Sequence, residues 1–308
     1  MSLLVLGTVA FDTIETPFGK AERIIGGAGT YVAWASSHFY KNIKLVSVVG
    51  DDFQSDELTA LENRGVNLEG LDIRKGEKSF FWAGRYHNNM NSRDTLATEL
   101  NVLENYAPVL PESTKKVDYL MLGNFAPAVQ KSVLDQLTER PKLVVMDTMN
   151  FWMDIAMDEL KTVISDVDVL TINDEEARQL SGEYALVKAA EVILKMGPTH
   201  LIIKKGEHGA LLFHQEGMFY VPALPLEEVF DPTGAGDSFA GGFVGYLAQT
   251  DDFSFENMKR ALVYGSVVAS FCVEKFGPNK LKSIDDEAIK ARTNEFLKLM
   301  DISMPVNC

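Results

Sequence analysis

The hydrophobic pattern of the chain alternates between short apolar runs and longer stretches of amphipathic or small-residue character. Short runs of this kind predict buried strands at residues 3–9, 44–49, 119–122, 143–146, 168–171, 200–204, 210–214 and 218–221. The longer stretches predict helices at residues 26–39, 54–64, 128–140, 151–164, 174–181, 184–196, 236–249, 255–274 and 285–300. Strands that alternate with helices predict an α/β fold of three layers, with helices on both faces of a mostly parallel sheet.

Two parts of the chain depart from this alternation. Residues 11–16 alternate between apolar and polar side chains, which predicts an exposed edge strand. Residues 71–73 and 79–86 predict antiparallel strands, whereas residues 88–110 are polar and predict no definite element. We expect residues of about 10–25 and 70–100 to form a small β-sheet lid over a site, within a single domain that spans residues 1–308.

Composition narrows the classes of partner. Hydrophobic residues make up 46% of the 308, enough for a substantial core, and the net charge is −15. Such an acidic chain lacks the basic surface that nucleic acids and acidic membranes require, so neither is expected as a partner. No run reaches the roughly 18 apolar residues of a membrane span, and the first residues lack the features of a signal peptide. We expect a cytoplasmic protein.

The most informative stretch runs from Asp231 to Phe243. An Asp-Pro turn leads into Gly234, Ala235 and Gly236, and a helix of small apolar residues follows. Backbone N–H groups without covering side chains, at the positive end of a helix dipole, form an anion site. Asp237 lies in the same first turn, where a carboxylate suits transfer of phosphate to a hydroxyl better than simple phosphate binding. The alternative is an ordinary glycine-rich helix start.

Several common nucleotide sites are excluded by their motifs. The sequence has no Gly-x-x-x-x-Gly-Lys-Ser/Thr, so it has no P-loop. The pair Gly234 and Gly236 lacks the third glycine of a dinucleotide fingerprint, because Phe239 stands there. The motifs of protein kinases are also missing. Since ligands of open α/β sheets bind beyond the carboxyl ends of strands, the polar residues there are candidate site residues: Asp12, Asp147, Asn173, Lys205 and Asp237.

The stretch from Asp231 to Phe239 resembles the C-terminal signature of the PfkB carbohydrate kinases, which have the ribokinase-like fold. Weaker motifs of that family follow in its order: Gly26-Gly27, residues 49–53, Asn173 with Glu176, and residues 205–209. The resemblance covers residues 3 to about 300. It implies phosphorylation of a small-molecule hydroxyl by ATP with Mg²⁺.

The resemblance also implies roles for individual residues. Asp237 would be the catalytic base, and the N–H groups of Gly234, Ala235 and Gly236 would form an anion hole. The implied acceptor-binding residues are Asp12, Gly26 and Gly27. The implied nucleotide-side residues are Asn173, Lys205, Gly206, Gly209 and Ser266, with Glu176 acting on Mg²⁺ through water. Asp231 and Thr233 would help to bind a monovalent cation such as K⁺.

Each role has a plainer alternative in the sequence. Asn173 and the acidic residues after it equally predict a helix N-cap, residues 206–209 a hairpin turn, and Ser266 a core helix position. Asp12 equally fits a polar edge strand.

The acceptor is the least defined part of the prediction. Many sugar kinases of the family carry an asparagine where Tyr31 stands, and an aromatic ring there could stack on a sugar or a base, or simply pack. Arg85, with the neighbouring aromatic residues Phe81, Trp82 and Tyr86, is expected to contact the acceptor from the lid. We predict a kinase for a sugar or sugar-like alcohol. The alternatives are a nucleoside kinase and a non-catalytic relative. A homodimer through the lid is compatible with the family.

Overall fold

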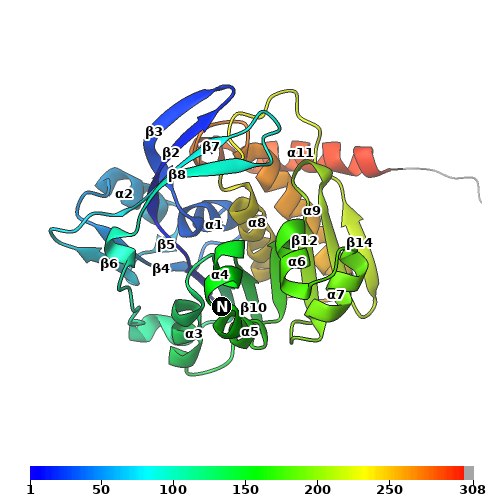
Figure 1. Cartoon of the computed structure of the whole chain (residues 1–308), viewed down its shortest axis with the longest axis horizontal. Helices are drawn as coiled ribbons and strands as arrows, with labels where there is room; N and C mark the ends of the chain where they lie inside the picture. The colour runs from blue at the N-terminus through cyan, green and yellow to red at the C-terminus, as the bar shows by residue number, and fades with distance from the viewer. Residues whose placement is uncertain (302–308) are drawn as a thin grey trace, which may run out of the picture.

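The structure, a computed structural model, describes residues 1–301, and the last residues of the predicted domain lie outside them. Within residues 1–301 the chain forms a ten-stranded sheet and a separate four-stranded sheet (Figure 1). The strands of the large sheet, in spatial order, are β14 (Gly217–Val221), β13 (Ala210–His214), β12 (His200–Lys204), β11 (Val169–Asn173), β10 (Leu143–Asp147), β9 (Tyr119–Leu122), β1 (Leu3–Leu6), β4 (Ile43–Gly50) and β5 (Val66–Asn67), with β6 (Leu71–Arg74) also paired to β4.

The large sheet is mostly parallel, as predicted. The pairs from β12 through β4 all run parallel, and the antiparallel pairs are those of β13 with β12 and with β14. The carboxyl ends of the parallel strands therefore lie at one edge, where Asp147 ends β10 and Lys204 ends β12.

Helices cover both faces of this sheet, each over its own hydrophobic core. On one face lie α1 (Ala28–Ser36), α2 (Ser55–Asn63), α8 (Ala235–Thr250), α9 (Phe255–Cys272), α10 (Asn279–Ser283) and α11 (Asp286–Met300). On the other lie α3 (Pro127–Gln136), α4 (Asn150–Ile155), α5 (Met157–Ile164), α6 (Asp174–Ser181) and α7 (Leu186–Leu194). Alternate residues of β1 divide between the two cores, since Leu3 and Val5 join the first and Leu4 and Leu6 the second. The predicted three-layer α/β fold is confirmed.

The small sheet forms the lid. Its strands, in order, are β3 (Gly19–Gly26), β2 (Ala10–Thr16), β7 (Phe80–Tyr86) and β8 (Arg93–Glu99). The central pair β2–β7 is parallel, and the two outer pairs are antiparallel. In Figure 1 these strands, in blue and cyan, rise from the body of the molecule at the top of the view.

Two expectations about strands were wrong. Residues 11–16 are not an exposed edge, because β2 lies between β3 and β7 and buries Phe11, Asp12 and Ile14. Of its polar side chains, Asp12 is buried, and Glu15, on the other face, forms an ion pair with Arg85 of β7. Residues 71–73 are not antiparallel lid strands either, since β6 pairs parallel with β4 in the large sheet. The lid strands of the second segment begin at Phe80.

Smaller differences concern element boundaries. The helix expected over residues 151–164 is two helices, interrupted at Ala156 by a non-helical backbone with φ −146° and ψ 41°. The polar segment at residues 88–110 contains β8, and α10 carries no pattern that predicted it. None of the helices in the described part of the chain is both long and apolar enough to cross a membrane.

Candidate active site

The loop before α8 and the first turn of this helix present open amide groups. Gly234 is the N-cap residue of α8 in the left-handed conformation, with φ +75°. The N–H of Ala235 donates to the carbonyl of Pro232 at 3.2 Å. The N–H groups of Gly234, Gly236 and Asp237 have no acceptor within residues 1–301. Of the anion hole predicted at residues 234–236, the Ala235 donor is thus used by the turn, and the N–H of Asp237 is an open donor that the sequence did not indicate.

The ring of Tyr31 packs against this loop at Gly234. A Cβ atom on Gly234 would lie 2.4–2.5 Å from three atoms of that ring. Tyr31 is 1% exposed, and its hydroxyl has no hydrogen-bond partner among the described residues. The structure therefore shows Tyr31 packing against the loop, and its contact with an acceptor stays a prediction.

Gly234→Ala is expected to distort this loop. Adding a Cβ both strains the left-handed backbone and collides with the Tyr31 ring, for a combined loss of about 2–4 kcal/mol in the free energy of unfolding. We also expect kcat to fall about 10-fold. Urea unfolding and turnover measure the two effects.

Gly182→Ala is the matched control. Gly182 ends α6 with φ +74°, and a Cβ there would meet no atom within 4 Å. It should lose only the backbone part, about 1 kcal/mol, and keep its turnover. Equal losses in the two variants would show that the contact with Tyr31 does not restrict Gly234.

A buried ion pair lies beside the open amides. Lys204 donates to the Asp147 carboxylate at 2.6 Å, and the two side chains are 17% and 6% exposed. A Cβ on Gly236 would lie 3.2 Å from the Lys204 ammonium nitrogen, so this cation adjoins the first turn of α8. The resemblance implied Lys205, the next residue, for this side of the site. Side chains alternate along a strand, so Lys205 would continue the face of the buried Leu201 and Ile203, and Lys204 the other face. The alternation alone does not indicate which of these faces meets the site.

The carboxyl groups around Lys204 have raised pKa values. Burial raises the pKa of Asp237 to about 6, and the charge of Asp147 adds to this, while Lys204 and then Arg93 oppose it. Burial likewise raises the pKa of Glu176 to about 7, with Lys204 opposing. Burial disfavours the charged Lys204, but Asp147, Glu176 and Asp237 outweigh it and raise its pKa. A base with a pKa near 6 is well matched to proton transfer at neutral pH.

Asn173 and Glu176 form a capping box at the start of α6. The Asn173 side chain accepts from the N–H of Glu176 at 2.8 Å, and the Glu176 carboxylate accepts from the N–H of Asn173 at 2.7 Å. The plainer alternative from the sequence, an N-cap, is therefore what the structure shows. Glu176 also lies near the site, because Glu176 and Lys204 act on each other's pKa.

The turn between β12 and β13 holds the other predicted nucleotide-side residues. The N–H of Lys205 donates to the carbonyl of Gly209 at 2.8 Å, and Gly206 and Gly209 have φ of +55° and +84°. The Lys205 side chain makes no hydrogen bond or ion pair within the described residues. Ser266 is buried in α9. Nucleotide binding by these residues stays a prediction.

Asp12 faces the site from the lid. A Cβ on Gly26 would lie 1.8 Å from an oxygen of the Asp12 carboxyl, so Gly26 leaves the room that this group occupies. Burial, and then the charges of Asp231 and Asp237, raise the pKa of Asp12 to about 8, against the N–H of Gly27. A carboxyl that is neutral at pH 7 can donate as well as accept a hydrogen bond, which suits recognition of an alcohol.

Asp231 organises the loop, and Thr233 joins it to the lid. The fully buried Asp231 carboxylate accepts from the N–H of Thr233 at 2.9 Å and from that of Gly277 at 3.0 Å. The Thr233 hydroxyl donates to the hydroxyl of Tyr86 at 3.1 Å. Binding of a monovalent cation by Asp231 and Thr233 stays a prediction.

The side chains of the lid strands lie on two faces of the lid, and one of these faces is turned to the site. Asp12 pairs with Trp82 across β2 and β7, so both lie on the site face, and Tyr86 follows Trp82 on that face four residues later. Arg85 lies on the opposite face, where it forms an ion pair with Glu15 at 2.8 Å and is about half exposed. The structure thus does not bring Arg85 to the site. Arg93, which the sequence analysis did not select, pairs with Tyr86 and shares the site face.

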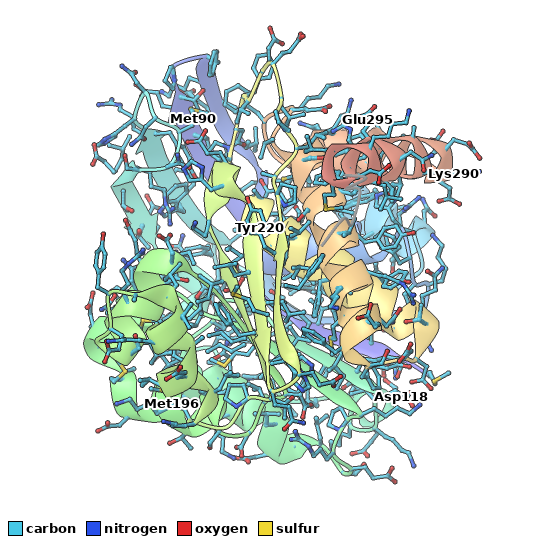
Figure 2. The ribbon with its side chains drawn as sticks, turned by 90° about the vertical axis from the view of Figure 1, so that its right-hand side faces the viewer. Met90, Asp118, Met196, Tyr220, Lys290 and Glu295 are labelled. Carbon is cyan, nitrogen blue, oxygen red and sulfur yellow. The ribbon has the colours of Figure 1, made fainter. Side chains whose placement is uncertain are left out.

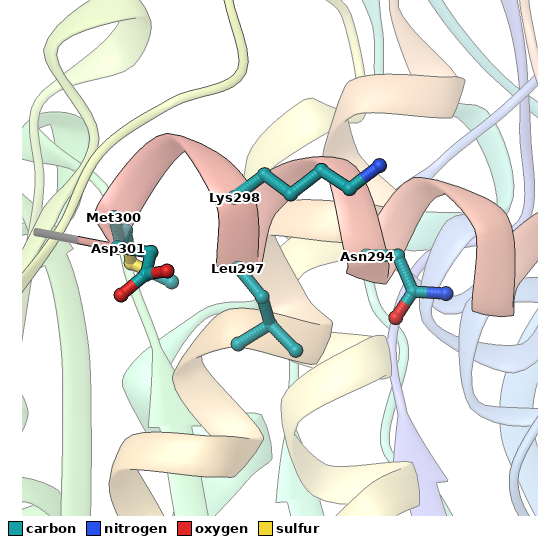
Figure 3. Close-up of a pocket in the computed structure, with 5 residues that line it drawn as sticks. All are labelled: Asn294, Leu297, Lys298, Met300 and Asp301. Carbon is teal, nitrogen blue, oxygen red and sulfur yellow. The ribbon is translucent and has the colours of Figure 1, made fainter.

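One hollow of the surface lies apart from this site. A hollow at the end of α11 is lined by Asn294, Leu297, Lys298, Met300 and Asp301 (Figure 3), and none of these is a residue of the site above. Among residues 1–301, no group of three or more His, Cys, Asp or Glu side chains is arranged to hold a metal ion.

Comparisons with known proteins agree with this geometry. Residues 4–284 match the model of the pfkB family carbohydrate kinases. A cytidine kinase of Thermococcus kodakarensis is 30% identical over 251 residues, which cover 79% of this chain and 87% of the relative. A ribokinase of Lactococcus lactis is 25% identical over 89% of this chain and 91% of its own.

Solved structures share the fold at lower identity. An Escherichia coli chain described provisionally as ribokinase II, solved with ATP and Mg²⁺, superposes with a TM-score of 0.79 at 19% identity, over 96% of this chain and 99% of the other. The family match over most of the chain, together with the ribokinase-like arrangement of a parallel sheet and a four-stranded lid, has one consequence: the chain belongs to the PfkB family of kinases, which are phosphotransferases.

Proposed function

We propose that the protein transfers phosphate from ATP to a hydroxyl of a sugar or of a sugar-containing small molecule. The observation that carries this proposal is the position of Asp237, whose carboxylate stands in the helix turn that also offers the open N–H groups of Gly236 and Asp237. A base and an anion site in one helical turn suit attack of an alcohol on a phosphoryl group.

Each residue of the site has its own role in the phosphate transfer. Asp237 accepts the proton of the acceptor hydroxyl, because burial holds its pKa near 6, where it is ionised at neutral pH and still basic. The open amides and Lys204 stabilise negative charge on the phosphoryl oxygens. Asp12, neutral near pH 7, holds acceptor hydroxyls on the lid side.

The oxygen atoms near Lys204 fit Mg²⁺ carried with ATP. Asp147 and Glu176 supply carboxylate oxygens there, and Asn173 supplies an amide oxygen. Mg²⁺ prefers oxygen ligands and keeps several waters, so these groups would hold it through water and through the phosphates of ATP. When bound, Mg²⁺ supplies charge neutralisation of the phosphates. The proposal extends to K⁺ at Asp231 and Thr233.

A nucleoside acceptor is the second candidate, and Trp82 favours it. Its ring lies across Gly84 on the site face, since a Cβ on Gly84 would be 2.1 Å from the ring. An aromatic surface on the Asp12 side of the site can stack on a base. The cytidine kinase similarity points the same way.

The test is ATP consumption over a panel of pentoses, hexoses, sugar acids, polyols and nucleosides, with and without Mg²⁺ and K⁺. We expect turnover with a sugar or a nucleoside, dependent on Mg²⁺. Turnover with cytidine or another nucleoside, without any with the free pentose, would decide for the second candidate. If no acceptor raises ATP consumption above the rate without acceptor, the proposed function is wrong.

The pH dependence follows from Asp237. Because the base must be ionised, kcat/KM at saturating MgATP is expected to fall about tenfold per pH unit below pH 6 and to level off above it. A rate that stays constant down to pH 4.5 would contradict this.

The raised pKa values of Asp12, Glu176 and Asp237 also affect stability. The folded protein binds these protons more tightly than the unfolded chain does, so their stabilising contribution is complete below about pH 4. It is lost as pH rises through 6, 7 and 8. Thermal unfolding of the free protein should therefore show a lower Tm at pH 8.5 than at pH 5.5.

A further inference from the structure

Arg93, the first residue of β8, lies on the face of the lid that turns toward the loop before α8. Arg93 pairs with Tyr86 across β7 and β8, and paired residues of antiparallel strands point to the same face. Tyr86 is buried, and its hydroxyl accepts a hydrogen bond from Thr233. The Arg93 side chain therefore leaves the lid beside a residue that touches this loop.

The hairpin that joins β7 and β8 reaches the turn after β12. The Asn91 amide donates to the Glu207 carboxylate at 3.0 Å, and a Cβ on Gly206 would lie 2.8 Å from the Asn91 side-chain oxygen. Met90, labelled in Figure 2, belongs to the same hairpin. Arg93 thus lies between two contacts of the lid. One is the hydrogen bond of Tyr86 with Thr233, on the acceptor side, and the other is that of Asn91 with Glu207, on the proposed nucleotide side. The phosphoryl group must pass between these two sides.

The charge of the Arg93 guanidinium is not paired with any described residue. Within residues 1–301 it makes no hydrogen bond or ion pair, and it lies 5.8 Å from the centre of the Trp82 ring. By contrast, Arg85 and Arg23, also in the lid, form ion pairs with Glu15 and Asp52. Lys204 is likewise bound to Asp147.

The charge of Arg93 acts on the pKa of the Asp237 and Glu176 carboxyl groups. Burial raises the pKa of both Asp237 and Glu176, and Arg93 is among the groups that oppose the rise in each case. Among the described residues, Arg93 and Lys204 are the cations that oppose the rise at both carboxyl groups. They approach from different elements, the lid and the large sheet.

We propose that Arg93 is a catalytic residue whose guanidinium binds the phosphoryl oxygens during transfer. The proposal rests on the proposed function. In the transfer, the bond between the acceptor oxygen and the γ-phosphorus forms, and the bond from that phosphorus to the β–γ bridging oxygen breaks. ADP leaves with the electron pair, and the acceptor proton passes to Asp237. Arg93 from the lid and Lys204 from the large sheet keep their protons and balance the charge. A planar guanidinium can hold two phosphoryl oxygens at once, and the ring of Trp82 limits its orientation.

The experiment compares Arg93→Met and Arg93→Lys with Lys20→Met. Lys20 is a matched lid cation in β3, exposed and paired with Glu22. Steady-state kinetics give kcat and both KM values. Calorimetry with Mg²⁺ gives the dissociation constants of ADP and of the non-hydrolysable ATP analogue AMP-PNP. Thermal unfolding checks that each variant is folded.

Arg93→Met is expected to lower kcat about 100-fold. It should weaken AMP-PNP binding about 10-fold while ADP binding changes less than twofold, because only AMP-PNP carries the γ-phosphate. Arg93→Lys should recover part of both losses, and Lys20→Met should match the wild type. A kcat within threefold of the wild type, or equal weakening of ADP and AMP-PNP, would overturn the role of Arg93. If the wild type phosphorylates no acceptor, the proposed function fails, and the two dissociation constants still decide whether Arg93 binds the γ-phosphate.

Discussion

Asp237→Asn is expected to lower kcat by about 10⁴-fold while the protein stays folded and still binds ADP. The asparagine keeps the shape of the side chain but cannot accept the proton of the acceptor hydroxyl, and removal of a general base costs up to this factor. Because burial disfavours the charged Asp237 and raises its pKa to about 6, the neutral asparagine should leave Tm unchanged or slightly higher. Turnover, ADP calorimetry and thermal unfolding measure the three quantities.

Asp12→Asn provides the comparison. The pKa of Asp12 is raised to about 8, so asparagine replaces a carboxyl that is already neutral at pH 7. We expect this variant to keep most of its kcat and to raise KM for the acceptor by a few fold, since one hydrogen-bond donor geometry is exchanged for another. More than about 1% residual kcat in Asp237→Asn would remove Asp237 as the base. A loss of kcat in Asp12→Asn as large as in Asp237→Asn would make Asp12 an equal candidate.

The sequence predicted the parts of the site that are fixed by local backbone chemistry. An Asp-Pro turn followed by glycines and small residues can hardly form anything except a turn into a helix, and the left-handed Gly234 lies where the pattern indicates. The capping box of Asn173 and Glu176 is also a local feature, since its two hydrogen bonds join residues three apart. The parallel strands were indicated by their continuous apolar runs, because helices cover both faces of such a sheet.

The sequence could not show which side chains of the strands face the site. Lys204 and Lys205 are adjacent at a strand end, and Arg85 and Arg93 are both polar lid positions, so composition does not separate them. Pairing decides the lid case: Arg85 falls opposite Glu15 on one face, and Arg93 falls beside Tyr86 on the other. A shift of one residue would reverse these assignments. Contacts distant in the sequence supply that information, and an alternation of polar and apolar residues does not.

The alternation over residues 11–16 likewise does not define which face of its strand meets solvent. Its polar positions were expected to face solvent, but Asp12 faces a covered site between the lid and the loop before α8. The pattern correctly indicated a two-sided strand. It could not tell a solvent-facing side from one that faces other carboxyl groups.

Lys204→Met is expected to reduce kcat about 10³-fold and to lower stability. The substitution removes the cation that adjoins Gly236, and with it stabilisation of charge on the phosphoryl oxygens. It also leaves the Asp147 carboxylate, 6% exposed, without its partner at 2.6 Å. An uncompensated buried charge costs about 3–5 kcal/mol in the free energy of unfolding.

The pH profile separates the chemical effect of Lys204→Met from its structural one. Lys204 opposes the rise in the pKa of Asp237, so without it that pKa should move above 6 and shift the acid limb of kcat/KM to higher pH. The double variant Asp147→Asn/Lys204→Met removes the unpaired charge as well, so it should regain most of the lost stability without regaining activity. If the double variant recovers both, Lys204 acts only by holding the fold. If the single variant keeps its acid limb at pH 6, Lys204 does not set the charge state of Asp237.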